Sequence, residues 1–499
     1  MGGNHVVPRH AAKGVASFHA PLLRPSLATV LFVALCSLPD VWTRRSTEIR
    51  MSTFSSRPPL WIGRSRRERV VPAFLICLGA AVSTPLLTGG SYLTSGTSRL
   101  ADQFTRASWV ILVVGIVVAL ATVRKEQFAL QENRRYTAIR FAGLAIVLTQ
   151  VLSSVFAHSL LSINAFLPMV LGLALVTRYP VRASEALRTV QIAVMIPVLA
   201  SIFAVLAGFS YAETGEPRRL PGLFVDTRLT GVLSHPNALA PVAATAFVVS
   251  VARRGRWWWL AAAAAGWTLW ATDTRTMILV APLALAVIEF ERRRVVPALR
   301  AALILCLSGV MLFALAASGS LTTVLGSGDI RGLNGRTQVW EQSVKLWQSS
   351  PFVGAGPQAF GEDFRARTGL TFAGQAHNQF FQSLAAEGIL GVLALCVLVV
   401  LLGRAAARNV ANTGGASLAL FVLFLANLST EAPLRASRWS SNLLVFVCLL
   451  AVSLAQTDPP DSHLGNAVKR GRNDLFHPSV AIGLHDTVSS PGASKHDQQ

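Results

Sequence analysis

The sequence has few charged residues, and the acidic ones are the scarcer kind. Aspartate and glutamate total 24 against 45 lysines and arginines, and charged residues make up only 14% of the 499 positions. Hydrophobic residues make up 52% and occur in long uninterrupted runs. This composition argues against a set of soluble domains and is typical of a polytopic membrane protein. Arginine-rich short loops are usual in such proteins, so the excess of arginine does not indicate nucleic-acid binding.

Cysteine is also scarce, with 5 residues, and no two of them stand in a CxxC or another ligand-like spacing. A disulfide framework or a zinc site is therefore not expected, and no other metal-ligand cluster is evident. No internal repeat is evident either. The short apolar run at 27–38 is not followed by a clean cleavage site, which makes a signal peptide a poor interpretation.

The chain divides into three parts. Residues 1–65 are expected to form a poorly ordered or cytoplasmic extension, within which Met51 is an alternative start. Residues 66–456 carry nearly all the long apolar runs and form the transmembrane domain. The remaining residues, 457–499, are rich in Pro, Ser, Asp and His and are expected to form a disordered cytoplasmic tail.

The transmembrane domain contains about twelve apolar windows that satisfy the ~20-residue rule for crossing a bilayer. With the N-terminus inside, every inner loop is basic, whereas the outer connections carry fewer charges or balance them with acids. We therefore predict an all-α membrane protein with about 12 transmembrane helices and both termini in the cytoplasm. The windows lie near 70–90, 107–123, 138–157, 160–177, 189–209, 233–252, 257–273, 276–290, 296–318, 379–403, 415–431 and 438–456.

This topology leaves one long extracytoplasmic loop at about 319–376, and loops of that length are usually functional. Within it, Trp340, Val344 and Trp347 fall on one face of an amphipathic helix predicted over 336–350. Tryptophan on such a face suits the membrane–water interface. Whether this helix lies on the bundle for stability alone or also serves a site is left open by the sequence.

Polar residues gather at four places on the outer side, and the arginines among them suit phosphate oxygens, which the planar guanidinium fork matches. Glu387 lies about three helical turns after the fourth place, inside an apolar span where an ionisable group is costly. The four places are Asp226–Arg228 with His235–Asn237, Asp273–Arg275, Gly335–Arg336 and His377–Asn378.

Each of these residues also has a purely structural interpretation. Arg228 can pair with Asp226, Arg275 can pair with Asp273, and Arg336 can be a helix-end residue in solvent. A lone histidine such as His377 is more often structural than catalytic. For Glu387 the structural interpretation comes first, because a straight helix holds it too far from His377 to contact it. The sharing of one membrane face by three arginines and a histidine is what favours function.

The motifs G-R-T-x-x-W at 335–340, P-F-V-G-A-G at 351–356 and H-N-Q-F-F-Q-S-L-A-A-E-G-I-L-G at 377–391 occur in this order. D-T-R-L-T-G and H-P-N precede them. In this combination the chain resembles the O-antigen ligase/polymerase superfamily of bacterial envelope glycosyltransferases. Topology extends the resemblance over roughly residues 65–456, and its most diagnostic part is the last third of the bundle.

The resemblance implies a polyprenyl-diphosphate-linked glycan as donor and a hydroxyl of a glycan or glycolipid as acceptor. It also implies reaction on the outer face of the bacterial cytoplasmic membrane, with no cofactor and no metal. His377 would then act as general base, while Arg228, Arg275 and Arg336 stabilise the departing diphosphate. Asn378 would orient the histidine or the sugar. Gly354 and Gly356 are expected to permit a tight turn rather than to bind phosphate.

The motifs do not separate a ligase from a polymerase. The rival interpretation from another class is a transporter or flippase of lipid-linked glycans, which would have a similar number of spans. Such a protein would be expected to carry charges at mid-membrane or repeats between its halves, whereas here the polar residues cluster on one face. A structural or assembly protein without activity is a third possibility.

Overall fold

The computed structural model describes residues 70–83, 134–158, 167–179, 181–209, 213–217, 225–233, 235–294, 336–371, 373–435 and 441–457. The expected spans at 107–123 and 296–318, the N-terminal extension and the tail after residue 457 lie outside the described residues.

The described residues are mostly helical, as predicted. The exception is a short antiparallel pair of strands, β1 and β2, in which Glu213 pairs with Leu229 and Pro217 with Thr227. The elements are α2 (Val70–Val82), α4 (Arg134–Phe156), α5 (Leu167–Arg178), α6 (Ala183–Leu206), β1 (Glu213–Pro217), β2 (Thr227–Leu229), α7 (Pro236–Arg253), α8 (Trp258–Ala271), α9 (Arg275–Arg292), α11 (Arg336–Ser349), α12 (Glu362–Thr368), α13 (Gln379–Arg408), α14 (Ala416–Thr430) and α15 (Ser441–Ser453).

Within the described residues, three helices are long and apolar enough to cross a membrane: α4 from Tyr136, α6 and α13. Four shorter helices, α2, α5 from Met169, α14 and α15, are also apolar. Large hydrophobic side chains remain exposed along the three long helices, for example Phe141 on α4, Phe203 on α6 and Val397 on α13. Apolar surface of this kind needs a nonaqueous neighbour, which agrees with a membrane protein.

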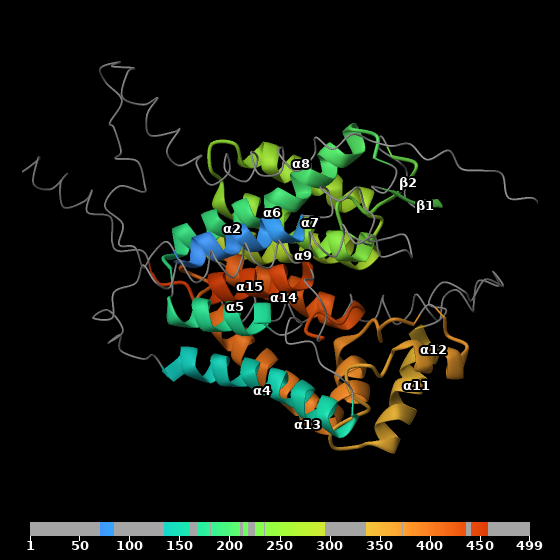
Figure 1. The fold of residues 1–499 in the computed structure, drawn as a ribbon. Coiled ribbons are helices and arrows are strands. Elements are labelled where there is room, and N and C mark those ends of the chain that lie inside the picture. The colour runs from blue at the N-terminus through green and yellow to red at the C-terminus, as the bar shows by residue number, and fades with distance from the viewer. Residues whose placement is uncertain are drawn as a thin grey trace, which may run out of the picture.

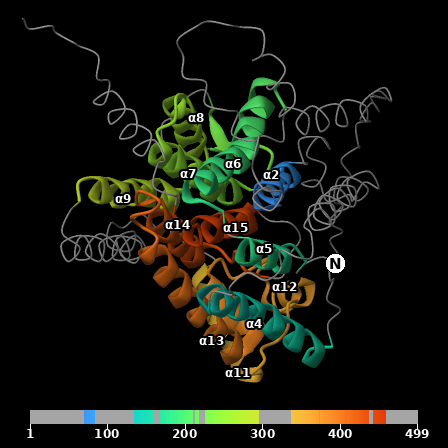
Figure 2. The same ribbon diagram turned by 90° about the vertical axis from the view of Figure 1, so that its left-hand side faces the viewer.

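The helices form a layered bundle (Figures 1 and 2), with α14 and α15 in the middle. The rings of Phe424 on α14 and Phe446 on α15 lie 5.7 Å apart and are among the largest fully buried side chains. On one side of this pair, α7 packs against α6, α8 and α9. On the other side, α13 runs alongside α4, and α11 packs against α13.

Helices α7 and α9 run between two ends of the bundle that differ in their chemistry. Each has 18 residues, which corresponds to a length of about 27 Å at ~1.5 Å per residue and is close to the thickness of a hydrocarbon core. Asn237 and Arg275 stand at their first turns. At the far ends, the Arg292 guanidinium donates to the carbonyls of Val251 and Ala252. The basic loops and the predicted site residues are therefore a membrane thickness apart.

The predicted amphipathic helix is present as α11, but its most buried residues differ from the expected face. Val339 and Ser343 are fully buried, and Leu346 packs against the same small core under the loop. Trp340 lies beside this stripe and stacks on Phe381 of α13, with ring centroids 5.1 Å apart. The indole N–H requires a polar partner, and Trp340 finds one at the carbonyl of Ala376, 2.8 Å away.

The helical geometry of α13 is interrupted at Gly388, whose φ of 67° is not helical. The turn formed by the P-F-V-G-A-G motif occupies the interruption. The carbonyls of Pro351 and Phe352 accept hydrogen bonds from the amides of Ile389 and Leu390, and the amides of residues 355 and 356 donate to the carbonyls of residues 385 and 386. Backbone groups that a broken helix would leave unpaired are thus satisfied by the turn.

The glycines of this turn adopt backbone conformations that a tight turn requires. Gly354 and Gly356 have φ values of 72° and 88°, in the region that favours glycine. A Cβ on Gly354 would lie 2.4 Å from backbone atoms of Ala386 and Glu387, so the turn and α13 approach as closely as two backbones can.

Candidate functional site

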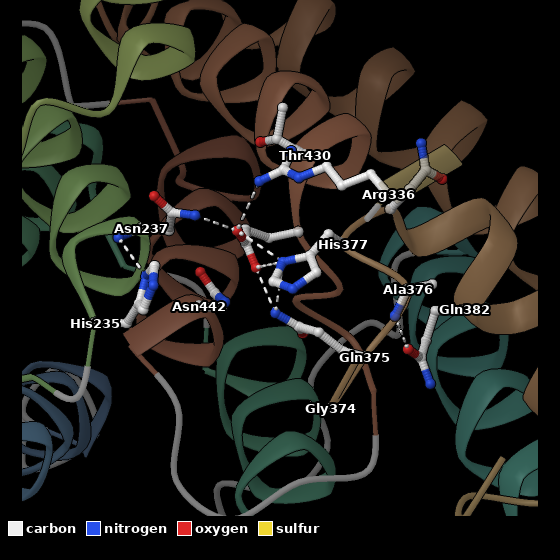
Figure 3. A network of polar contacts seen from close by, with 12 residues as sticks. His235, Asn237, Arg336, Gly374, Gln375, Ala376, His377, Gln382, Thr430 and Asn442 are labelled. Atoms are coloured by element: carbon white, nitrogen blue, oxygen red, sulfur yellow. Dashed lines mark hydrogen bonds and ion pairs between the residues drawn. The ribbon is translucent and has the colours of Figure 1, made fainter. Parts of the chain in front are cut away.

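Polar side chains that include Asn237, Gln375 and His377 converge at one end of the bundle (Figure 3), and the group on which they converge is the buried carboxylate of Glu431. Glu431 is the residue that follows the last turn of α14, and its side chain is only 7% exposed. One carboxylate oxygen accepts a hydrogen bond of 2.8 Å from the amide of Asn237, and the other accepts one of 2.6 Å from the amide of Gln375. Three segments that are far apart in the sequence therefore meet at this carboxylate.

His377 contacts the same carboxylate. Its Nδ1 atom lies 3.4 Å from each oxygen of Glu431, and the amide nitrogen of Gln375 lies 3.3 Å from that ring nitrogen. Among the residues that the structure describes, none forms a hydrogen bond with Nε2. The side chain is 21% exposed. One nitrogen of the ring is thus engaged with protein, and the other remains for a substrate.

The backbone that holds His377 is tightly constrained. His377 has a φ of 50°, which is uncommon for a residue other than glycine and is a frequent feature of functional sites. On one side of it, the amide of Ala376 donates to the side chain of Gln382. On the other side, Asn378 caps α13 by accepting from the amides of Phe380 and Phe381, and it donates to the carbonyl of Ser429. Asn378 thereby holds the histidine beside the end of α14.

Two of the three predicted arginines join the network. Arg336, the first residue of α11, lies 3.9 Å from Glu431 and is 31% exposed. Arg228, in β2, donates to the side-chain oxygen of Asn237 at 3.3 Å and to the carbonyl of Thr272 at 3.3 Å.

Arg275 lies at the same end of the bundle but is not part of the network. It is exposed at the first position of α9, next to Thr274, whose hydroxyl lies 3.3 Å from the side-chain oxygen of Asn237. With the described residues it forms no hydrogen bond or ion pair. Its guanidinium is therefore available to a ligand that covers this end of α9.

The charge of Glu431 is stabilised by these neighbours. Burial on its own would raise the pKa of the carboxyl group, but the hydrogen bond and charge of His377, the charge of Arg336 and the hydrogen bond from Asn237 outweigh it. The pKa of Glu431 is consequently held below its ordinary value of 4.5. A carboxylate kept ionised beside an imidazole can fix the orientation of the ring and stabilise its protonated form.

Glu387 contacts residues of α4 and not His377. Its carboxylate accepts a hydrogen bond of 3.0 Å from Gln150 of α4, and the hydroxyl of Thr149 lies 3.5 Å away. It is 2% exposed and links α13 to α4. The helix does break, at Gly388, but the break accommodates the turn at 351–356 and does not bring Glu387 to the histidine.

The sequence did not identify Glu431, Asn237 or Gln375 as partners of the histidine. Glu431 carried a usable signal, because it is an acid at the very end of an apolar window, directly after Thr430 and two residues before Pro433. His235 and Asn237 were noted, and His235 is the cap of α7, where its Nδ1 accepts from the amide of Asn237. No three His, Cys, Asp or Glu side chains of the described residues are grouped as metal ligands.

Comparison with known protein families gives a match in the C-terminal half of the chain. The family model described as O-antigen ligase matches residues 260–396. That range contains Arg275, Arg336, His377 and Asn378, and the match confirms the resemblance predicted from the motifs. Arg228 and Glu431 lie outside the matched residues, although both contact the same network. No curated protein matches the chain.

Proposed function

We propose that this chain, whose residues 260–396 match the family model described as O-antigen ligase, moves a glycan from a polyprenyl-diphosphate carrier to an acceptor hydroxyl. The reaction takes place on the outer face of the cytoplasmic membrane and ligates or polymerises a surface polysaccharide. The observation that carries the proposal is the His377–Glu431 pair with a contact of 3.4 Å, flanked by arginines.

In this mechanism the acceptor hydroxyl attacks the anomeric carbon of the donor sugar from the side opposite the diphosphate. A carbon–oxygen bond to the acceptor forms as the bond to the phosphate oxygen breaks, and the anomeric configuration is inverted. Nε2 of His377 takes the hydroxyl proton as general base. Glu431 accepts from Nδ1–H, which selects the tautomer with its lone pair on Nε2 and stabilises the imidazolium that forms.

The arginines act on the leaving group. The departing polyprenyl diphosphate gains negative charge as the sugar leaves, and guanidinium groups stabilise that charge by paired hydrogen bonds. Arg228 joins the network through Asn237, and Arg336 joins it through Glu431. Arg275, exposed at the same end of α9, completes the set. Asn237 links Arg228 to the carboxylate, because it accepts a hydrogen bond from Arg228 and donates one to Glu431.

The sidedness of the proposal is supported by charge and length. The site lies at one end of α7 and α9, whereas Arg253, Arg254 and Arg292–Arg294 lie at the other end, about 27 Å away. Trp257 and Trp259, both more than half exposed, flank the basic end, as aromatic residues do at a membrane interface. By the positive-inside rule, the basic end faces the cytoplasm.

The test is a transfer assay with the purified protein, a polyprenyl-diphosphate oligosaccharide and candidate acceptors. We expect glycosidic product, release of polyprenyl diphosphate in equal amount, and inversion of the anomeric configuration as read by NMR. The size of the product separates a polymerase from a ligase. Movement of intact donor across proteoliposomes without any product would instead indicate a flippase and contradict the proposal.

A further inference from the structure

A polar cavity of about 200 Å³ lies beside the histidine segment, between α4, α13 and the turn that precedes α12. It is not part of the Glu431 network, and the proposed mechanism does not use it. Three glutamines, a glutamate and an arginine contribute to its lining, together with the ring of Phe360. The polar members are Gln150, Gln358, Gln382, Glu387 and Arg435.

Two lining residues connect the cavity to His377. Arg435 donates a hydrogen bond of 2.7 Å to the carbonyl of Gly374, and Gln382 accepts from the amide of Ala376. Both contacts lie on the α13 side of the segment, whereas Asn237 reaches Glu431 from the α7 side. Figure 3 shows Asn237 and Gln382 on opposite sides of the histidine. A ligand in the cavity would therefore approach His377 from the side opposite Arg228.

The lining contains a hydrogen-bonding atom without a partner. Gln150 is 3% exposed, and its amide nitrogen donates both to Glu387 and to the carbonyl of Leu434. Its oxygen atom is buried, and none of the residues that the structure describes donates a hydrogen bond to it. A buried acceptor of this kind is costly unless something supplies a donor. A hydroxyl group is a suitable donor for it.

The chemistry of the lining selects the class of ligand. Amide side chains donate and accept at once, which matches hydroxyl groups, and the Phe360 ring offers an apolar face. Arg435 can attract an anion, but it already donates to the carbonyl of Gly374, and the carboxyl group of Glu387, which is 2% exposed, lies in the same lining. A neutral ligand rich in hydroxyl groups therefore fits the lining better than a phosphate. The volume is below the ~300–1,000 Å³ of pockets for drug-sized ligands. One sugar ring suits the space better than a whole oligosaccharide.

We propose that this cavity binds one sugar ring of the acceptor glycan and presents its hydroxyl to His377. The assignment rests on the proposed transferase function. It places the acceptor sugar on the α13 side of the histidine, where its hydroxyl can give a proton to the base, while the leaving group departs from the opposite face of the anomeric carbon.

The experiment combines binding with kinetics on the purified full-length protein. Gln358, exposed at the cavity, is changed to tryptophan to obstruct it, and Gln150→Met removes the orphan amide within it. Gln338→Trp, on the exposed face of α11 and outside the lining, is the matched control. Saturation-transfer NMR with a panel of methyl hexopyranosides as probes reports binding without any need for turnover.

We expect saturation transfer to at least one probe in wild type and in Gln338→Trp, and its loss in Gln358→Trp. In the transfer assay, Gln358→Trp should raise the acceptor KM by about tenfold while donor KM and kcat at saturating acceptor are retained. Gln150→Met should act in the same direction if it folds. Equal saturation transfer in Gln358→Trp and wild type, or saturation transfer to none of the probes, overturns the assignment. Probe binding without any glycosidic product contradicts the proposed function instead, and the assignment to an acceptor falls with it.

Discussion

Replacing Glu431 with glutamine tests the pair at the centre of the site. The change keeps the size of the side chain but removes its charge and puts an NH2 group where one oxygen accepted a hydrogen bond. That NH2 group faces the amide of Asn237 or Gln375 and Nδ1 of His377, so at least one of the four contacts is lost. Since Glu431 is 7% exposed, solvent replaces little of this loss.

The size of the effect follows from the contacts. A hydrogen bond to a charged group contributes about 1.5–3 kcal/mol. Because ~1.36 kcal/mol corresponds to a factor of ten in rate, loss of the bond that orients His377 should lower kcat about 10- to 150-fold. The donor KM should change little, since Glu431 acts on the histidine and does not bind the donor itself.

The assay is transfer from a polyprenyl-diphosphate oligosaccharide, with kcat and KM measured separately. Glu341→Gln is the control, because Glu341 pairs with Lys345 on the exposed face of α11. Glu431→Asp should recover part of the rate, as it restores the charge one methylene short of its position. Wild-type kcat in Glu431→Gln, with the protein folded, would refute the positioning role.

Three further perturbations address the rest of the site and its scaffold. Arg336→Lys keeps the charge but loses the planar fork, so kcat should fall by about tenfold or more with thermal stability unchanged; full activity would reduce Arg336 to a simple positive charge. Gly354→Ala introduces a Cβ 2.4 Å from backbone of α13 at a φ of 72°, and should lower the melting temperature by an amount equivalent to at least ~1–2 kcal/mol; Gly255→Ala, where the nearest atom is 3.7 Å away, is the control. Because the pKa of Glu431 is lowered in the folded protein, its ionised carboxylate contributes to stability above about pH 4.5, and this contribution is lost as the pH falls through the folded-state pKa. The difference in melting temperature between wild type and Glu431→Gln should therefore shrink over that acid range. A difference that does not depend on pH would count against an ionised Glu431.

The sequence was sufficient for features that depend on local patterns. The helix at 336–350 and the apolar helix that begins after His377 were predicted from periodicity and are present as α11 and α13. The stripe of α11 that packs was misplaced by one residue, since Val339 and Ser343 are buried instead of Val344 and Trp347. The sequence assigned the tryptophan face to the membrane–water interface; in the fold, Trp340 lies at the edge of the buried stripe, where its N–H donates to the carbonyl of Ala376.

Local patterns could not predict contacts between segments that are distant in the sequence. Asn237, Arg336, His377 and Glu431 come from four separate parts of the chain, and no periodicity links the ends of α7, α11, α13 and α14 that carry them. The break at Gly388 was also missed, because the apolar run continues through it. It becomes visible only when the turn at 351–356 is seen to supply the missing hydrogen bonds. The structural role given to Glu387 stays a prediction; in the fold its carboxylate accepts a hydrogen bond from Gln150 on α4.

The central claim is that His377 accepts the proton of an acceptor hydroxyl in a glycan transfer reaction. Its most direct test is the rate of product formation by His377→Ala, measured with purified protein whose melting temperature and membrane abundance match wild type. We predict a loss of about 10²–10⁴-fold, the usual contribution of a general base, with donor binding retained. Product formation by His377→Ala at the wild-type rate would contradict the claim.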